Sequence, residues 1–175
     1  MSMRDRLLIV TIGVALAGAA AAAESPNLGR PATAEEMAAW DLSIGPDGAG
    51  LPPGSGTPRQ GEAVFAAKCA ACHGENGTGK PNDRLVGGQG TIATDSPVKT
   101  VGSYWPYATT IFDYVRRAMP LTQSKSLSND EVYAVVAYVL RLNGIIAEDE
   151  VMDARTLPKV RMPNRDGFVP FRPAR

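Results

Sequence analysis

The 175-residue chain is predicted to have an all-α fold, with an arm before its main helices and an extended tail after them. Two segments, 58–71 and 129–143, start with helix-capping residues and carry apolar side chains at helical spacing. No alternating apolar and polar run, which would indicate a strand, flanks the cysteine pair that follows the first segment. We therefore expect four parts: a signal peptide (1–23), an arm with one short helix (24–57), the main helical domain (58–146) and an extended tail that packs on the domain or on a partner (147–175).

The N-terminus has the features of a secretory signal peptide. The segment MSMRDR is positively charged, residues 7–19 are apolar or small, and the alanines at 21–23 offer an A-x-A cleavage site. An uncleaved membrane anchor is the alternative, although the apolar run is short of the ~20 residues that span a bilayer. Cleavage after residue 23 leaves 16 basic and 17 acidic side chains. A chain so close to neutral lacks the basic face that nucleic-acid binding requires.

The arm is rich in Gly and Pro, which predicts turns and extended chain. Within it, Thr33 and Glu36 have the spacing of a capping box and predict a helix that continues to about Leu42. Thr57 and Pro58 then provide the N-cap and the first residue of the helix that opens the main domain.

The helix at 58–71 has a small residue on the face that leads to the cysteines. Gly61, Phe65 and Cys69 are four residues apart and therefore lie on one face. We expect a later helix to cross closely at Gly61. Tyr138 is the expected aromatic partner for Gly61 and Phe65.

The motif CAACH, from Cys69 to His73, contains both cysteines and the single histidine of the sequence. This spacing is the attachment signature of c-type haem, in which both thiols bond to the porphyrin and the histidine is the fifth ligand of iron. Three alternatives compete: a zinc site, which normally needs four ligands; a thioredoxin-like redox pair, which needs a βαβ setting; and a plain disulfide. We predict one covalent haem c on Cys69, Cys72 and His73. Because such haem is attached outside the bacterial cytoplasm, we expect a periplasmic protein with no membrane attachment after cleavage.

Residues 74–103 are rich in glycine and lack helical periodicity. A haem face would give this long loop an apolar surface to pack against. Leu85, Val86 and Ile92 are candidates for the haem pocket, with ordinary core packing as the alternative. Polar residues of the loop and two aromatic residues after it could hydrogen-bond the haem propionates, with solvation or core packing as the alternative for each: Arg84, Gln89, Lys99, Trp105 and Tyr107.

Two more helices and a tail complete the prediction. Pro106 can begin a helix that ends before Pro120. Ser128 and Glu131 form a second capping box, and the apolar stripe that follows predicts a helix that stops at Asn143. In the tail, prolines leave room only for a short helix around residues 149–154.

A low-spin haem iron needs a sixth ligand, and methionine is the first choice because no second histidine exists. The candidates after residue 23 are Met37, Met119, Met152 and Met162. We favour Met119, which precedes Pro120 between two helices, so that the last helix can close the pocket. Met37 is expected to pack in a core, and Met162, which also precedes a proline, stays an alternative. An open or lysine-ligated iron would instead indicate ligand binding or catalysis at the haem.

The strings GEAVFAAKCAACHGENGTG and SNDEVYAVVAYVL, with the methionine-proline turn between them, resemble the class I cytochrome c domain. In that family an N-terminal helix carries CxxCH and is crossed by a C-terminal helix. The resemblance implies a cytochrome c fold with His73 and Met119 as axial ligands and Cys69 and Cys72 as thioether donors. It also implies single-electron transfer without bond-making chemistry by the protein itself.

Longer strings resemble the cytochrome subunit SoxD of the Sox sulfane dehydrogenases, among them LGRPATAEEMAAWDLSIGPDGAGLPPGSG, PVKTVGSYWPYATTIFDYVRRAMP and LPKVRMPNRDGF. The resemblance implies a molybdenum-containing partner subunit (SoxC-like) that oxidises a sulfane sulfur, and a downstream cytochrome or oxidase as acceptor. Longer family members add a second haem domain, whereas this sequence has one CxxCH, so we expect direct delivery to a separate acceptor. A sulfite dehydrogenase subunit, or a free soluble carrier between unrelated redox enzymes, is the alternative.

Overall fold

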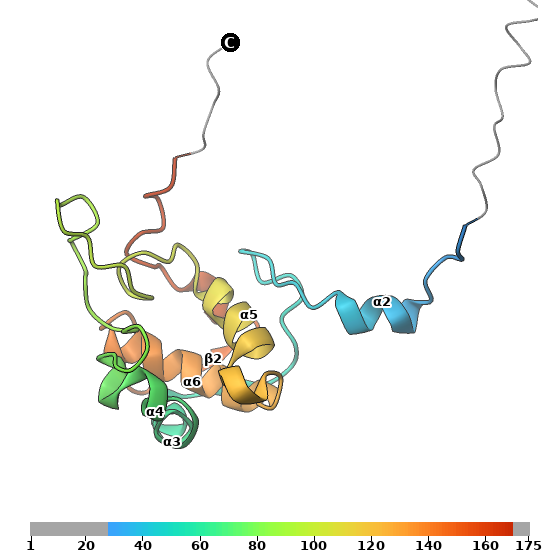
Figure 1. Cartoon of the computed structure of the whole chain (residues 1–175), viewed down its shortest axis with the longest axis horizontal. Coiled ribbons are helices and arrows are strands. Elements are labelled where there is room, and N and C mark those ends of the chain that lie inside the picture. Colours follow the sequence, from blue (N-terminus) through green and yellow to red (C-terminus); the bar gives the residue numbers. More distant parts are fainter. Residues whose placement is uncertain (1–27, 170–175) are drawn as a thin grey trace, which may run out of the picture. The chain divides into compact units, whose positions relative to one another are not determined.

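The computed structural model describes residues 28–169 (Figure 1), so the predicted signal peptide lies outside the described part. Contacts divide the chain into one unit that ends at Trp40 and a second that begins at Asp41. Besides its helices, the described part has two strands of two residues each. The prediction of an all-α fold is therefore confirmed, with a minimal sheet added to it. Among residues 28–169, no helix is both long and apolar enough to cross a membrane.

The first unit contains the helix α2 (Ala34–Trp40). The predicted capping box is present, because the Thr33 amide donates to Glu36 Oε2 at 2.9 Å and the Glu36 amide donates to Thr33 Oγ1 at 3.2 Å. The helix ends at Trp40, two residues earlier than predicted. Met37 is 57% exposed, so α2 by itself gives this side chain no core.

The first helices of the second unit are α3 (Pro58–Lys68) and α4 (Ala70–His73), which meet at Cys69. Thr57 is the N-cap of α3, as predicted, and Gln60 completes a capping box with it: the Gln60 amide donates to Thr57 Oγ1 at 3.3 Å and the Thr57 amide donates to Gln60 Oε1 at 2.9 Å. A short 3-10 helix, Glu75–Gly77, follows directly. The CAACH motif thus begins where one helix ends and closes with the next.

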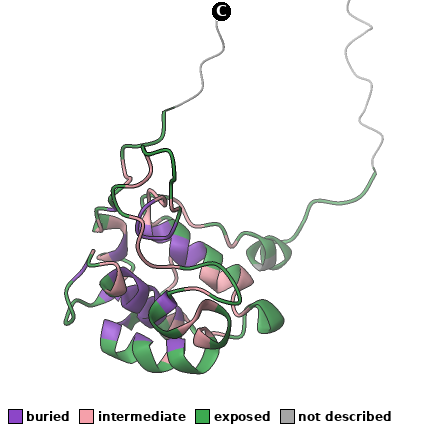
Figure 2. Cartoon of the chain, turned by 60° about the vertical axis from the view of Figure 1, so that its left-hand side comes forward, coloured by how far each residue is buried: buried purple, intermediate pink, exposed green. Residues whose placement is uncertain are grey.

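The other two helices are α5 (Ala108–Ala118) and α6 (Asn129–Leu142). α5 starts two residues after Pro106, with Tyr107 as its N-cap, and Met119 follows its last residue. α6 has the predicted capping box of Ser128 and Glu131. Every residue of α6 from Val132 to Leu140 is buried (Figure 2), rather than one stripe of it. α6 is therefore the central helix of this unit, because only a helix covered on all sides is apolar all round.

Among the described residues, the most extensive contact between two helices is that of α3 with α6 (Figure 1). A Cβ added at Gly61 would lie only 1.9 Å from the carbonyl oxygen of Ala134 and 2.8 Å from Cβ of Tyr138. One turn later, the rings of Phe65 and Tyr138 pack with their centroids 5.4 Å apart. The prediction that Tyr138 packs against Gly61 and Phe65 is confirmed.

The sheet consists of β1 (Ser55–Gly56) and β2 (Met152–Asp153), which pair antiparallel. It joins the end of the arm to the tail, because Ser55 pairs with Asp153 and Gly56 pairs with Met152. The short helix predicted around residues 149–154 is wrong, because β2 occupies that segment.

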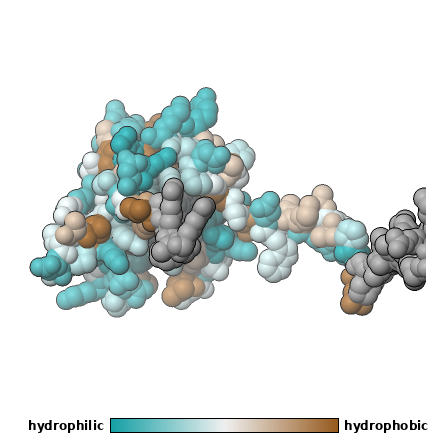
Figure 3. Space-filling model, turned by 90° about the horizontal axis from the view of Figure 1, so that it is seen from above, coloured by the Kyte–Doolittle hydropathy of each residue, from teal (hydrophilic) through white to brown (hydrophobic). Residues whose placement is uncertain are grey.

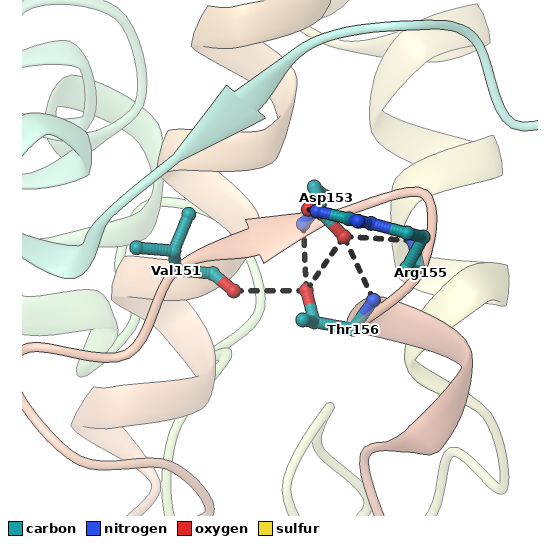
Figure 4. Close-up of polar contacts among 4 residues, drawn as sticks. All are labelled: Val151, Asp153, Arg155 and Thr156. Atoms are coloured by element: carbon teal, nitrogen blue, oxygen red, sulfur yellow. Dashed lines mark hydrogen bonds and ion pairs between the residues drawn. The ribbon is translucent and has the colours of Figure 1, made fainter.

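A polar turn follows β2 (Figure 4). The Asp153 carboxylate accepts hydrogen bonds from the amides of Arg155 and Thr156 at 2.7 and 2.8 Å, and the Thr156 hydroxyl donates to the carbonyl of Val151 at 2.8 Å. These bonds pair backbone amides of the turn with side-chain oxygens, as in a helix N-cap. A 3-10 helix, Leu157–Lys159, follows the turn.

The tail contributes three side chains to the hydrophobic core. Met152, Leu157 and Met162 are all at most 2% exposed and belong to the same cluster as the buried residues of α5 and α6. The tail is therefore part of the packed domain as far as it is described.

On the face drawn in Figure 3, hydrophobic side chains lie in separate places on a mostly hydrophilic surface.

Candidate haem-binding site

The CAACH motif presents two thiols and one imidazole from adjacent helical turns. Cys69 is half-buried and Cys72 is exposed, and the two are not joined in a disulfide. His73 ends α4, and its Nδ1 lies 2.8 Å from the backbone carbonyl oxygen of Asp83. Because a carbonyl oxygen can only accept, Nδ1 carries the proton and Nε2 keeps its lone pair. This is the arrangement that metal-binding histidines normally have, with one nitrogen bonded to an acceptor and the other available to the metal.

The loop after the motif folds back onto it through backbone hydrogen bonds. The amide of Asn82 donates to the carbonyl of Cys72 at 2.8 Å, and the amide of Gly79 donates to the carbonyl of His73 at 2.6 Å. The amide of Leu85 donates to the carbonyl of Gly77 at 2.8 Å. These bonds place the Asp83 carbonyl beside the His73 ring.

The thiols do not have the environment of a redox pair or a zinc site. Burial raises the pKa of the Cys69 thiol to about 11, whereas reactive or metal-bound cysteines need a depressed pKa. Within residues 28–169 no three or more His, Cys, Asp or Glu side chains are grouped so that they could hold a metal ion. The two-residue strands of this part of the chain also give CxxC no βαβ setting. Among residues 28–169, the surroundings of Cys69 and Cys72 therefore lack what a zinc site or a thioredoxin-like pair requires, and thioether formation stays a prediction.

The candidate methionines differ in what surrounds their sulfur atoms. Met119 has extended backbone, with φ −113° and ψ 149°, and is half-buried. Met152 and Met162 are 2% and 1% exposed, enclosed by side chains of the hydrophobic core. A sulfur that binds haem iron must face the porphyrin, so one already surrounded by protein side chains is poorly placed. This difference favours Met119 over Met162.

The predicted pocket residues share partial burial. Leu85, Val86 and Ile92 are all half-buried, and Leu85 packs against the core. Trp105 is half-buried too, with its ring edge-to-face against Tyr114 at a centroid distance of 5.7 Å. The protein leaves part of the apolar surface of these side chains exposed, and a large apolar cofactor such as haem would cover it.

The candidates for propionate contacts fall into two groups. Arg84 is exposed directly beside Asp83, and neither the Trp105 indole nor the Tyr107 hydroxyl makes a hydrogen bond within residues 28–169. Tyr107 is half-buried with the guanidinium of Arg165 4.3 Å above its ring centroid. By contrast, Gln89 donates to Asn143, and the Lys99 ammonium lies 5.0 Å from the ring centroid of Tyr104. Gln89 and Lys99 are thus engaged elsewhere, whereas Arg84, Trp105 and Tyr107 stay candidates.

Two residues of the site escaped the sequence prediction. Asp83 acts through its backbone carbonyl, so its side-chain identity carries no signal. Asn143 was predicted only as a helix stop, yet its side chain bonds to the loop around residues 85–89. These partners lie more than 50 residues away in sequence, and only the fold brings them together.

The fold and the site together define a class I cytochrome c. A helix that leads into CxxCH, a central C-terminal helix that crosses it and a methionine loop between them are the features of that fold. Residues 56–139 match the protein family described as cytochrome c oxidase, cbb3-type, subunit III. A cytochrome c domain implies that the chain binds haem.

More specifically, the chain belongs to the SoxD-like cytochromes. It is similar to a chain in the crystal structure of the sulfane dehydrogenase SoxCD from Paracoccus pantotrophus, with 44% identity and a TM-score of 0.80 over 84% of this chain and 73% of that one. It is also 32% identical over 82 residues to a thiosulfate dehydrogenase of Psychrobacter arcticus. That match takes in 47% of this chain but spans only about a quarter, 25%, of the relative's length.

Proposed function

We propose that this chain is a periplasmic monohaem c-type cytochrome that accepts single electrons from a molybdenum-containing dehydrogenase subunit during the oxidation of sulfur compounds. The observation that carries the proposal is the geometry of His73. Its Nδ1 is bonded to the Asp83 carbonyl, so Nε2 is available for iron at the end of the short helix that also presents Cys69 and Cys72. Haem c supplies the one-electron chemistry when it is bound.

The remaining ligands follow from the surroundings described above. Cys69 and Cys72 would form the thioethers, and His73 and Met119 would bind the iron. A thioether ligand favours reduced iron relative to a second imidazole, which suits an acceptor of electrons. Arg84, Trp105 and Tyr107 would bind the propionates.

The length of the SoxCD match supports a role as an enzyme subunit. The match covers 84% of the chain. Residues 58–146, the haem domain, are a smaller share of the chain, so the match also includes residues outside this domain. A free carrier needs only the haem domain, whereas segments shared with a subunit of a dehydrogenase point to a shared mode of assembly. The downstream electron acceptor would be a separate cytochrome or oxidase.

The partner is tested by purifying the tagged chain from the periplasm of its native bacterium, after the cells have grown on thiosulfate. We expect a molybdenum-containing dehydrogenase to co-purify, and the haem of the complex to be reduced when that enzyme receives its sulfur substrate. A monomer that never retains a molybdenum protein, and that exchanges electrons rapidly with a respiratory acceptor, would favour the free carrier instead.

The iron ligands are tested by spectroscopy of two variants. Met119→Ala is expected to lose the sulfur-to-iron charge-transfer band of the oxidised protein, whereas Met162→Ala keeps it. Loss of the band in Met162→Ala alone would overturn the assignment. Rapid binding of carbon monoxide to the reduced wild-type protein would indicate an open iron and a role in catalysis or sensing.

A further inference from the structure

The side chain of Asn143, just after α6, uses its whole hydrogen-bonding capacity. Its Nδ2 donates to the carbonyl oxygens of Leu85 and Val139 at 3.1 and 2.9 Å. Its Oδ1 accepts from the amide of Gly87 at 3.1 Å and from Nε2 of Gln89 at 3.2 Å. Two donors and two acceptor sites are all that an amide side chain has. Asn143 therefore connects the end of the central helix to the loop at residues 85–89, and no donor or acceptor of its side chain is left without a partner.

The partners fix the orientation of this amide. Two backbone carbonyls can only accept, and the Gly87 amide can only donate. A flipped side chain would place oxygen against two carbonyls and nitrogen against an N–H group. Gly102 lets the amide come close, because a Cβ at this position would lie 2.1 Å from Asn143 Oδ1. No other residue type presents both donors and acceptors in this shape.

The segment that Asn143 holds is the one that carries the hydrogen-bond acceptor of His73. The carbonyl of Asp83 accepts from His73 Nδ1, and the carbonyl of Leu85, two residues later, accepts from Asn143. Before Asp83 the segment is fixed by the bond from the Asn82 amide to the Cys72 carbonyl. After Asp83 it is held by Asn143, together with the bond from Leu85 to Gly77 and one from the Thr100 hydroxyl to the Gly87 carbonyl at 2.5 Å.

We propose that Asn143 is a positioning residue for the haem ligand His73, acting through the backbone of residues 83–87. This inference rests on the proposed function, because it takes His73 as the proximal ligand. Donation from Nδ1 to a well-placed carbonyl makes the imidazole a stronger electron donor to the metal. A stronger donor stabilises ferric iron. By holding the Asp83 carbonyl in place, Asn143 lowers the reduction potential.

The test compares haem-loaded full-length wild type with Asn143→Ala. The reduction potential is measured by spectroelectrochemistry, and the Nδ1 proton is followed by NMR of ferrous protein labelled with 15N-histidine and purified without a histidine tag. Because the sequence has a single histidine, only one imidazole is observed. In Asn143→Ala we expect faster solvent exchange of the Nδ1 proton. We also expect a shift of up to about tenfold toward ferrous iron, which is ~59 mV upward for one electron.

Two control variants separate positioning from stability. Gln89→Ala removes both hydrogen bonds from Gln89 Nε2 to Asn143 but keeps the bond from Asn143 to the Leu85 carbonyl. Ser128→Ala weakens α6 at its other end. Both should keep the wild-type potential, although Ser128→Ala should lower the melting temperature. If Asn143→Ala does not accumulate, Gly102→Ala displaces the same amide and should give the same two shifts.

A fall in melting temperature with an unchanged potential and an unchanged Nδ1 proton would overturn the positioning role. A wild-type protein that carries no haem would instead contradict the proposed function. The two failures are therefore distinguishable.

Discussion

The crossing of α3 and α6 depends on the absence of a side chain at Gly61. In Gly61→Ala, the new Cβ would meet the carbonyl oxygen of Ala134 at 1.9 Å and the carbonyl carbon at 2.5 Å. Non-bonded heavy atoms normally stay about 3.5 Å apart. Since these atoms belong to the backbone of α6, no rotation of a side chain relieves the contact. The helices must separate or bend, which loosens the packing of Phe65 on Tyr138.

The cost can be estimated from two opposing effects. Overpacking of a well-packed core costs about 1–3 kcal/mol, and a clash with backbone belongs at the upper end of that range. Alanine is better than glycine in a helix by about 1 kcal/mol. The net loss of stability in Gly61→Ala is therefore about 2 kcal/mol, or roughly 8 °C in melting temperature for a domain of this size.

The assay is thermal unfolding of the haem-loaded protein, followed by far-UV circular dichroism. Glu62→Ala is the matched control, because this exposed neighbour on the same helix has no such contact, and its stability should stay within about 0.5 kcal/mol of wild type. A Gly61→Ala variant as stable as wild type would refute the reasoning, since the helices would then have room for a methyl group at their crossing.

Three further predictions concern single hydrogen-bonded groups. Amide donation, chiefly from Thr156, lowers the pKa of the Asp153 carboxyl to about 2. Its contribution to stability is therefore complete above an unfolded pKa of about 3.9 and is lost as the pH falls toward 2. Between about pH 5 and pH 2 the melting temperature should fall further in wild type than in Asp153→Asn, and equal falls would contradict this. Thr57→Ala removes the N-cap of α3 and should cost about 1 kcal/mol in urea unfolding; an unchanged midpoint would mean that the cap is dispensable. Tyr133→Phe loses the 2.9 Å hydrogen bond from its hydroxyl to the Pro52 carbonyl. Its free energy of unfolding should fall by about 1 kcal/mol in the same assay. An unchanged free energy would mean that water takes the place of the hydroxyl.

Local signals in the sequence predicted the helices of the domain well. Capping residues bond to amides three positions away, so Thr57 and Ser128 mark helix starts without any help from the fold. The close approach at Gly61 was also predictable, because a small residue four before an aromatic one indicates a helix crossing. CAACH identified the candidate site by itself, since both cysteines and the histidine lie within five residues.

What the sequence did not predict depends on contacts between distant segments. β1 and β2 have two residues each and lie far apart in the sequence, with Gly56 paired to Met152, so neither segment has a periodicity that reveals it. The tail was predicted to pack on the domain or on a partner, but nothing in its sequence showed that Met152, Leu157 and Met162 would enter the core. Met37 sits on a helix with an apolar side, yet periodicity does not tell whether anything covers that side.

The most direct test of the central claim is the intact mass of the protein purified from the periplasm of a host that attaches c-type haem. The account predicts the mass of the chain from Glu24 onward plus one haem. The peptide that contains Cys69 and Cys72 should carry this haem, and should lose it completely only in a variant in which both cysteines are replaced. A mass equal to the polypeptide alone, with two free thiols or a disulfide, would contradict it.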